Sequence, residues 1–147
     1  MINSNINKIK YTQYHVPKGY VNTIILNELN LDFSKPITLV EGFFDMINAN
    51  ENCTFLVGSN LSTKSKLFEE IVKNQTDVYL ALDPDASKKL DQIAREFLKY
   101  DISVFSIDVS PFKDVGEMTR QAFDEKYKEA KQITKNNFLL NKIRALA

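Results

Sequence analysis

Short apolar runs alternate with amphipathic stretches through the middle of the chain. The short runs are rich in β-branched and aromatic residues and predict four buried strands, at Ile37–Val40, Thr54–Val57, Val78–Leu82 and Ser103–Ile107. The stretches that separate or follow them have apolar positions at helical spacing, at Phe43–Asn50, Ser65–Lys73 and Ala86–Tyr100. This alternation predicts an α/β fold with a mostly parallel four-stranded sheet flanked by helices.

The two ends of the chain have weaker patterns. Ile6–Val16 and Tyr20–Leu29 are compatible with strands, with a turn at Pro17-Lys18-Gly19 between them. Gln121–Ile133 and Asn137–Leu146 have helical patterns. The chain is accordingly divided into a short N-terminal extension of strand and turn elements, a central α/β domain and a basic helical C-terminal segment, at residues 1–35, 36–120 and 121–147.

The composition excludes several classes of protein. One cysteine, Cys53, and one histidine, His15, are too few for an internal disulfide or a four-ligand zinc site. No apolar run is long enough to span a bilayer, and the N-terminus lacks the basic-then-apolar layout of a signal peptide. These observations predict a soluble protein that acts in the cytoplasm and has no membrane partner.

Charge is balanced over the whole chain but unevenly distributed. Nineteen Lys and Arg residues match nineteen Asp and Glu residues, yet basic residues dominate positions 1–20 and 126–147. Basic ends around an acidic centre indicate that the ends contact a polyanion while the centre holds cations. The alternative is an ordinary solvated lysine-rich helix, and charge alone favours that interpretation.

Three of the four predicted strands run directly into a carboxylate. These acids are Glu41, Asp83 and Asp108. Parallel strands end at the same edge of their sheet, where open α/β folds bind ligands, so we expect Glu41 and Asp83 to lie close together. Asp85 follows across Pro84, which stiffens the turn and directs both aspartates to one side.

Further acids are expected near this edge. Asp45 lies one helical turn after Glu41, and residues 113–117, Lys-Asp-Val-Gly-Glu, form an acidic loop after a strand. Converging carboxylates repel one another unless one keeps a proton or a cation lies among them. All-oxygen ligands favour Mg²⁺ or Mn²⁺, which makes phosphodiester chemistry the expected reaction class. The alternative for each single acid is a helix N-cap or a solvated loop residue.

The order of these motifs resembles the TOPRIM domain family of topoisomerases, primases, nucleases and recombination proteins. The resemblance rests on Leu39-Val40-Glu41-Gly42-Phe43-Phe44-Asp45 and on Leu82-Asp83-Pro84-Asp85-Ala86, and it covers roughly residues 36–120. Gly58-Ser59 and the loop at 113–117 make the chain most similar to the TOPRIM domains of bacterial and phage DNA primases. A phage-encoded chain would act in the host cytoplasm.

The resemblance implies roles for the matching residues. The implied catalytic residues are Glu41, Asp83 and Asp85, and the implied ligands of Mg²⁺ or Mn²⁺ are these three with Asp114. Gly42 is implied to allow close backbone approach and Asp45 to support the ligands by hydrogen bonds. Lys88, Lys89 and Lys113 are candidate contacts to phosphate or nucleic acid, with exposed helix lysines as the alternative for the first two.

The resemblance leaves three functions open. The first is a primase-like domain that joins ribonucleotides into RNA primers on single-stranded DNA during replication, with a helicase or a separate primase subunit as possible partner. The second is a small metal-dependent TOPRIM nuclease. The third is a non-catalytic module that binds nucleic acid or a replisome partner through a docking helix formed by Phe138, Leu139, Ile143 and Leu146, unless these pack on the domain's own core.

Two departures from the primase pattern bear on that choice. Ala86-Ser87-Lys88 stands where primases often have Ala-Gly and a basic residue, and Gly116 stands where many relatives have an acid or Asn. The residues before Pro36 are too few for the zinc-binding module and basic subdomain of a full primase. We therefore expect a stand-alone TOPRIM unit, a subunit of a split primase or a fragment.

Overall fold

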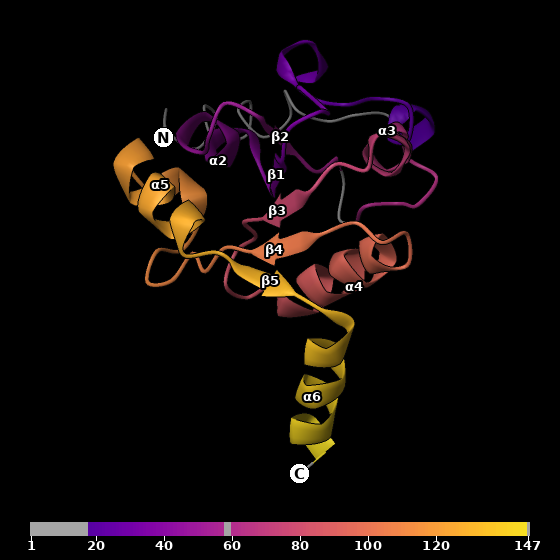
Figure 1. Ribbon diagram of the computed structural model, residues 1–147. Coiled ribbons are helices and arrows are strands. Elements are labelled where there is room, and N and C mark those ends of the chain that lie inside the picture. The colour runs from indigo at the N-terminus through magenta and orange to yellow at the C-terminus, as the bar shows by residue number, and fades with distance from the viewer. Residues whose placement is uncertain (1–17, 58–59, 147) are drawn as a thin grey trace.

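The computed structural model describes residues 18–57 and 60–146 and has a central sheet with helices on both faces (Figure 1). The elements, in chain order, are η1 (Lys18–Tyr20), η2 (Glu28–Asn30), β1 (Ile37–Val40), α2 (Phe43–Asn48), β2 (Cys53–Phe55), α3 (Lys66–Asn74), β3 (Val78–Leu80), α4 (Ser87–Leu98), β4 (Val104–Ser106), η3 (Val115–Glu117), α5 (Arg120–Lys128), β5 (Lys131–Ile133) and α6 (Lys135–Leu146).

The sheet has the strand order β2-β1-β3-β4-β5. The first four of these strands are parallel, and β5 is antiparallel to β4. The four strands predicted from the sequence are therefore confirmed, together with the α/β fold, and a fifth strand extends the sheet. Since β1 and β3 are neighbours, the residues that follow them come out side by side at one edge.

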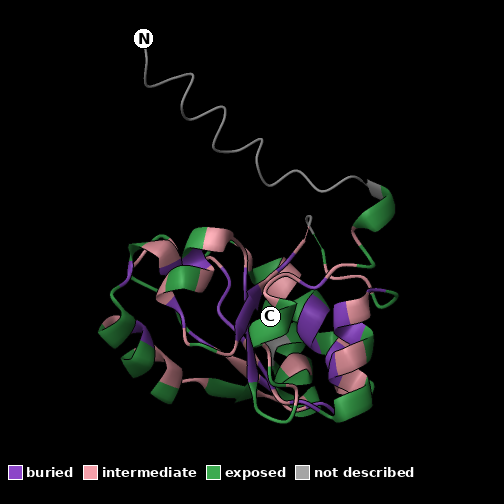
Figure 2. Cartoon of the chain, turned by 90° about the horizontal axis from the view of Figure 1, so that it is seen from above, coloured by how far each residue is buried: buried purple, intermediate pink, exposed green. Residues whose placement is uncertain are grey.

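Two apolar clusters hold the helices on the sheet. One face carries α3 and α4, whose buried residues include Ile71 and Phe97, and the other face carries α2 and α5, where Phe123 is fully buried. Figure 2 shows these buried residues concentrated between the sheet and its covering helices. Alternate strand residues point to opposite faces, so Leu39 joins the first cluster and Val40 the second.

The region before the first strand differs from the prediction. Residues 20–29 form no strand: 3₁₀ turns occur at Lys18–Tyr20 and Glu28–Asn30, and Ile25 packs into the core. Asn27 adopts a left-handed backbone conformation, φ 61°, and its side-chain amide donates to the carbonyl of Cys53 at 2.9 Å. Such a conformation ends any extended run. The other predicted strand, at 6–16, lies outside the described residues, as does Pro17 of the predicted turn.

The region after the last parallel strand differs as well. The helical pattern predicted over residues 121–133 ends at Lys128, and Lys131–Ile133 form β5. Val104 pairs with Ile133 and Ser106 with Lys131, which satisfies backbone groups that β4 would otherwise leave open at the edge of the sheet. The segment after residue 120 therefore contributes a strand to the sheet of the central domain.

The predicted C-terminal helix is present as α6. Phe138 packs against the core, whereas Leu139, Ile143 and Leu146 are exposed. The interpretation that all four apolar residues pack on the domain's own core is therefore wrong for these three. Within residues 18–57 and 60–146, no helix is long and apolar enough to cross a membrane.

Candidate functional site

Glu41 and Asp83 meet at the carboxyl edge of the sheet, as predicted. Glu41 directly follows β1, and Asp83 lies three residues after the end of β3. The backbone N–H of Asp83 donates to Oε2 of Glu41 at 3.0 Å. This hydrogen bond joins the two loops that follow adjacent strands and fixes the position of the Glu41 carboxylate.

A lysine neutralises Glu41. Nζ of Lys89, in the first turn of α4, lies 2.9 Å from Oε1 of Glu41, and the two side chains are 19% and 20% exposed. Burial of Glu41 raises its pKa, but the hydrogen bonds from Lys89 and from the backbone of Asp83 outweigh that effect and hold the pKa below its usual value. Lys89, expected to contact phosphate, therefore pairs with the principal carboxylate of the site.

Asp83 has the opposite electrostatic environment. Burial, the hydrogen bond with Glu41, and the negative charges of Glu41, Asp45 and Asp114 raise the pKa of Asp83 to about 7. Its Oδ1 atom is buried and has no hydrogen-bond partner among the residues that the structure describes. The paired acids thus differ in state, with Glu41 ionised and Asp83 able to gain or lose a proton near neutral pH.

The raised pKa of Asp83 predicts that the free energy of unfolding depends on pH and that Asp83→Asn removes this dependence. Because the pKa of Asp83 is raised on folding, the folded protein favours the protonated form, and stability falls as pH rises from about 4 to about 7. Asn resembles the protonated acid, so the variant should gain stability relative to the unaltered protein over this range. After discounting for solvent screening, we expect a gain on the order of 1 kcal/mol. Urea unfolding at each pH, in EDTA, measures it.

Asp108→Asn is the control, because its effect on stability should have the opposite sign. Hydrogen bonds from the backbone and side chain of Ser110 lower the pKa of Asp108. Stability from this group is therefore lost as pH falls below about 4, so above about pH 4 its variant should be less stable than the unaltered protein by an amount that no longer changes with pH. Equal slopes for the Asp83 variant and the unaltered protein would contradict the raised pKa of Asp83.

Asp45 ties the helix after β1 to the late acidic loop. Asp45 is buried at the third position of α2, and its Oδ1 accepts from the backbone N–H of Gly116 at 2.8 Å. Burial and the negative charge of Asp114 raise the pKa of Asp45. The hydrogen bond from Gly116 lowers it by less, so the pKa is raised overall. Asn48, one turn further along α2, donates to the carbonyl of Gly116 at 2.8 Å. Asp45 and Asn48 thus dock η3 on α2, while support of the ligands by Asp45 stays a prediction.

The contact between Asp45 and the late loop is tight at Gly116. A Cβ atom on Gly116 would lie 3.1 Å from Oδ1 of Asp114 and 3.3 Å from Oδ1 of Asp45. A Cβ atom on Gly42 would lie 3.4 Å from Oδ2 of Asp45, which is ordinary contact. The close approach expected at Gly42 is therefore found at Gly116 instead. Sequence reasoning missed Asn48, although its position three residues after Asp45 places both on one face of the helix.

The other predicted residues lie at the margin of this cluster. Asp114 caps η3, where its side chain accepts from the backbone N–H of Glu117 at 3.1 Å, yet its charge still reaches Asp83 and Asp45. Asp85, Lys88 and Lys113 are exposed, and Asp85 is absent from the charges that raise the pKa of Asp83. Glu41, Asp83 and Asp45 therefore form the centre of the site.

The donor chemistry of the centre fits a hard cation. Its side chains offer carboxylate oxygens only, and one of them, Oδ1 of Asp83, is buried without a described partner. The charges of Glu41, Asp45 and Asp83 influence one another. Within residues 18–57 and 60–146, however, no three His, Cys, Asp or Glu side chains lie close enough together to bind one ion. The positive charge next to Glu41 in this structure is the ammonium group of Lys89.

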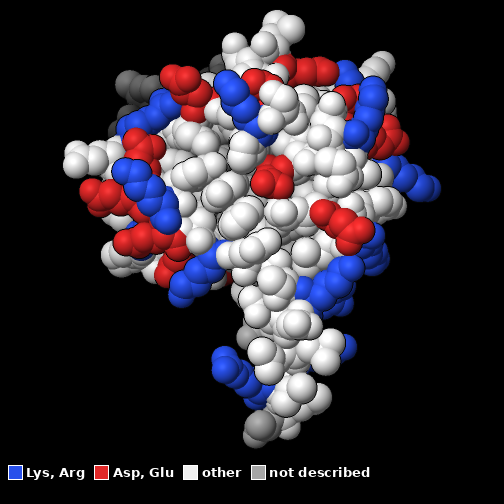
Figure 3. Space-filling view, in the orientation of Figure 1, with Lys and Arg blue, Asp and Glu red and all other residues white. Residues whose placement is uncertain are grey.

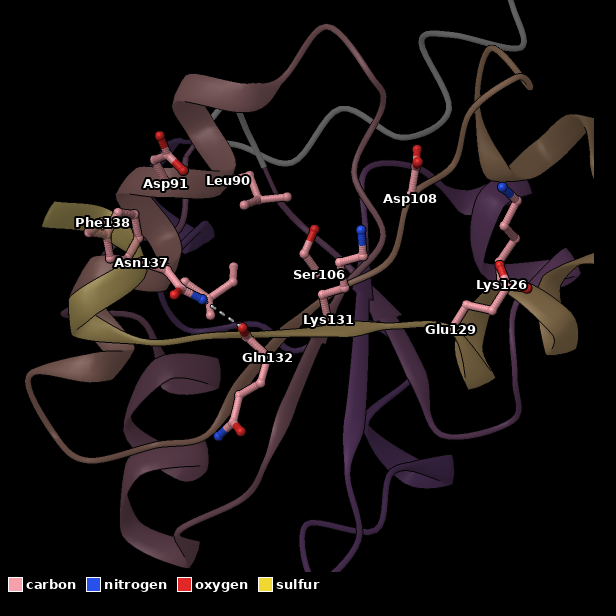
Figure 4. Close-up of a pocket in the computed structure, with 11 residues that line it drawn as sticks. Leu90, Asp91, Ser106, Asp108, Lys126, Glu129, Lys131, Gln132, Asn137 and Phe138 are labelled. Carbon is pink, nitrogen blue, oxygen red and sulfur yellow. Dashed lines mark hydrogen bonds between the residues drawn. The ribbon is translucent and has the colours of Figure 1, made fainter. Parts of the chain in front are cut away.

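A cavity of about 520 Å³ opens beside α4 and β5 (Figure 4). Its walls carry charges of both signs, from Asp91, Asp108, Lys126 and Lys131. None of the predicted catalytic or metal-binding residues lines this cavity. Asp108, the acid that follows β4, lines this cavity, whereas Glu41, Asp45 and Asp83 do not.

Comparison with known proteins supports the fold. No family model and no curated protein matches the chain. Among solved structures, the chain is similar to the zinc-binding and RNA polymerase domains of the primase from Aquifex aeolicus, with a TM-score of 0.56 and 16% sequence identity. The match covers 67% of this chain and 26% of the chain in that structure, so this chain spans about a quarter of the structure it matches. The α/β fold described above is therefore one that also occurs within a primase.

Proposed function

We propose that this chain is a TOPRIM domain of the primase kind, which joins ribonucleotides into RNA primers on single-stranded DNA during replication. The observation that carries the proposal is the Glu41–Asp83 pair at the carboxyl ends of adjacent parallel strands. The similarity of the fold to part of a primase supports it. The proposed substrates are a single-stranded DNA template and nucleotides, and a helicase or a separate primase subunit is the partner class that it implies.

Glu41, Asp83 and Asp85 are the proposed ligands of Mg²⁺ or Mn²⁺, with Asp114 beside them. A bound divalent ion would stabilise the negative charge that develops on the transferred phosphoryl group. Glu41 is kept ionised by Lys89 and by the N–H of Asp83, so it is ready to accept a proton or to bind a cation. Asp83, with its pKa raised to about 7, exchanges a proton at working pH.

Two exposed lysines flank the proposed site. Lys88 lies at the start of α4 and Lys113 lies just before the loop that contains Asp114. Both side chains are free to approach a phosphate, and backbone phosphates are the usual partners of exposed lysines in nucleic-acid binding. Lys89 is engaged with Glu41, which leaves Lys88 and Lys113 as the proposed phosphate contacts.

A denaturing gel tests the proposal. The protein is incubated with labelled single-stranded DNA and differently labelled ribonucleotides, in Mg²⁺, in Mn²⁺ and in EDTA. We expect short ribonucleotide chains with either metal and none in EDTA. Shortened DNA without new RNA would show that the protein is a nuclease and not a primase. Nucleic-acid binding without either product would instead indicate a non-catalytic module.

A further inference from the structure

Helix α6 carries an apolar surface that the other residues described by the structure leave exposed. The helix extends away from the sheet beyond β5 (Figure 1). Its base is fixed by Phe138, which packs on the core and lies under the guanidinium of Arg95, 5.6 Å from the ring centre. Four large aliphatic side chains further along are 52–85% exposed: Leu139, Leu140, Ile143 and Leu146. Such a concentration on one helix is typical of a contact surface.

A groove between α4 and α6 adjoins this surface. It has a volume of about 480 Å³, and its apolar lining comes from Leu98, Phe138, Leu139 and Ala145. Its charged lining is mainly basic, with Arg95, Lys99, Lys135 and Lys142 against Asp91. Lys99 pairs with Glu96 at 2.8 Å and Lys135 with Asp101 at 3.6 Å. Helix α6 itself contains no acid, and Figure 3 shows basic side chains along it and beside its base. The groove therefore combines an aliphatic floor with a positive rim.

We propose that the α4–α6 groove binds an acidic amphipathic peptide segment of a partner protein. Apolar side chains of the segment would cover Leu98 and Leu139, and its carboxylates would pair with Arg95 and Lys142. A helix or extended segment of this kind docks by burying one apolar face while the rim fixes its orientation. The proposal concerns a surface distinct from the proposed catalytic edge.

The chemistry of the groove favours this occupant over nucleic acid, a second copy of the chain, or its own N-terminus. Single-stranded nucleic acid binds through aromatic platforms, and the one aromatic ring in the lining, Phe138, is covered by Arg95. Two α6 helices packed together would bring basic residues against each other. Residues 1–17 carry Lys8 and Lys10 and no acid, so the basic rim would repel them.

The position of the groove leaves the carboxyl edge open. Lys89 lies near the start of α4 and Lys99 at its end. At 1.5 Å per helical residue the two are about 15 Å apart along the axis. The α4 side of the groove runs from Asp91 to Lys99, and neither Glu41 nor Lys89 lines it, so variants in the groove test docking without altering the proposed catalytic residues.

Fluorescence anisotropy with the full chain tests the proposal. The probe is a fluorescein-labelled synthetic helix of about sixteen residues, with Leu at helical spacing on one face and Glu on both flanks. The matched peptide has Gln in place of every Glu. We expect the acidic probe to bind at least about tenfold more tightly than the Gln peptide at low salt. Lys142→Glu and Leu139→Ser should each weaken acidic-probe binding by about tenfold.

Matched substitutions elsewhere control for charge and hydrophobicity. Lys73→Glu reverses an exposed lysine on α3, and Leu29→Ser removes a fully exposed leucine in η2, so both should leave binding unchanged. Circular dichroism verifies that each variant is folded. Equal binding of the two peptides, or binding that Lys142→Glu and Leu139→Ser leave intact, overturns the proposal.

Two further outcomes would assign the groove to another occupant and also overturn the proposal. One is displacement of the probe by a thymidine oligonucleotide whose own binding is lost in Leu139→Ser. The other is a dimer seen by light scattering that Leu139→Ser converts to a monomer. Neither outcome bears on the Glu41–Asp83 site, which is tested by the gel assay.

Discussion

Replacing Glu41 by Gln is expected to reduce primer synthesis by about a thousandfold or more. Gln has nearly the same size and keeps an oxygen that can accept the N–H of Asp83, which Glu41 accepts at 3.0 Å. It has no negative charge, so it can neither take up a proton nor bind a divalent ion as a carboxylate does. The loss should fall on the rate at saturating nucleotide, measured from the gel assay as product formed with time.

Glu69→Gln is the matched control. Glu69 is an exposed glutamate in the first turn of α3, and the substitution removes the same charge away from the carboxyl edge. We expect unchanged activity in this variant. Thermal unfolding of both variants is measured alongside, because Glu41→Gln leaves the ammonium group of Lys89 without its partner. Full activity in a folded Glu41→Gln protein would show that the catalytic assignment is wrong.

The sheet and the pairing of its acids could be predicted because both depend on local pattern. β1 is a short run buried at all four positions, and β2 and β3 are each followed by a helix with its own apolar stripe. Once the strands are parallel, their ends must share an edge, so Glu41 and Asp83 had to approach each other across forty-two positions.

The fifth strand could not be predicted in the same way. The residues Lys131-Gln132-Ile133 have no run of apolar positions, and the first two are exposed. Their extended conformation comes from pairing with β4, a contact between distant parts of the structure. Strand preference in such a segment depends on its partner more than on its own residues. From the sequence alone, a lysine-rich stretch that follows a helix is therefore predicted to continue that helix.

The different positions of Lys88 and Lys89 follow from the phase of α4. Lys89 precedes the buried Ile93 by four residues and therefore lies on the inward side of the helix, whereas Lys88 precedes the exposed Gln92 by four. The sequence thus contains the signal that separates the two lysines. It does not contain the identity of the partner, because Glu41 reaches Lys89 only through the pairing of β1 with β3.

This ion pair makes Lys89 a competitor for any cation at the site. Its ammonium group lies 2.9 Å from Oε1 of Glu41, and both side chains are about four-fifths covered. A divalent ion that binds Glu41 must share or replace that contact. A hydrogen bond between charged groups in such a setting contributes about 1.5 to 3 kcal/mol. Displacing the lysine therefore lowers the net affinity of the site for the metal.

Lys89→Met is accordingly expected to bind Mg²⁺ or Mn²⁺ about tenfold more tightly than the unaltered protein. Methionine keeps much of the aliphatic stem that covers the site and removes the charge. Isothermal titration with each metal, without substrate, measures the affinity directly. Lys88→Met, one residue earlier and exposed, removes the same charge from the outer side of the helix and should change the affinity much less.

The opposite result would assign Lys89 a different role. If Lys89→Met leaves metal affinity unchanged while Glu41→Gln lowers it, Glu41 would bind the metal without losing its contact with Lys89. The kinetics of primer synthesis in Lys89→Met then distinguish a lysine that the metal displaces from one that stays on Glu41. A displaced lysine is free to contact the phosphate that arrives with the metal, so its loss would raise the nucleotide KM even as metal binding tightens. A lysine that stays on Glu41 only positions the carboxylate, and its loss would lower kcat with little change in KM.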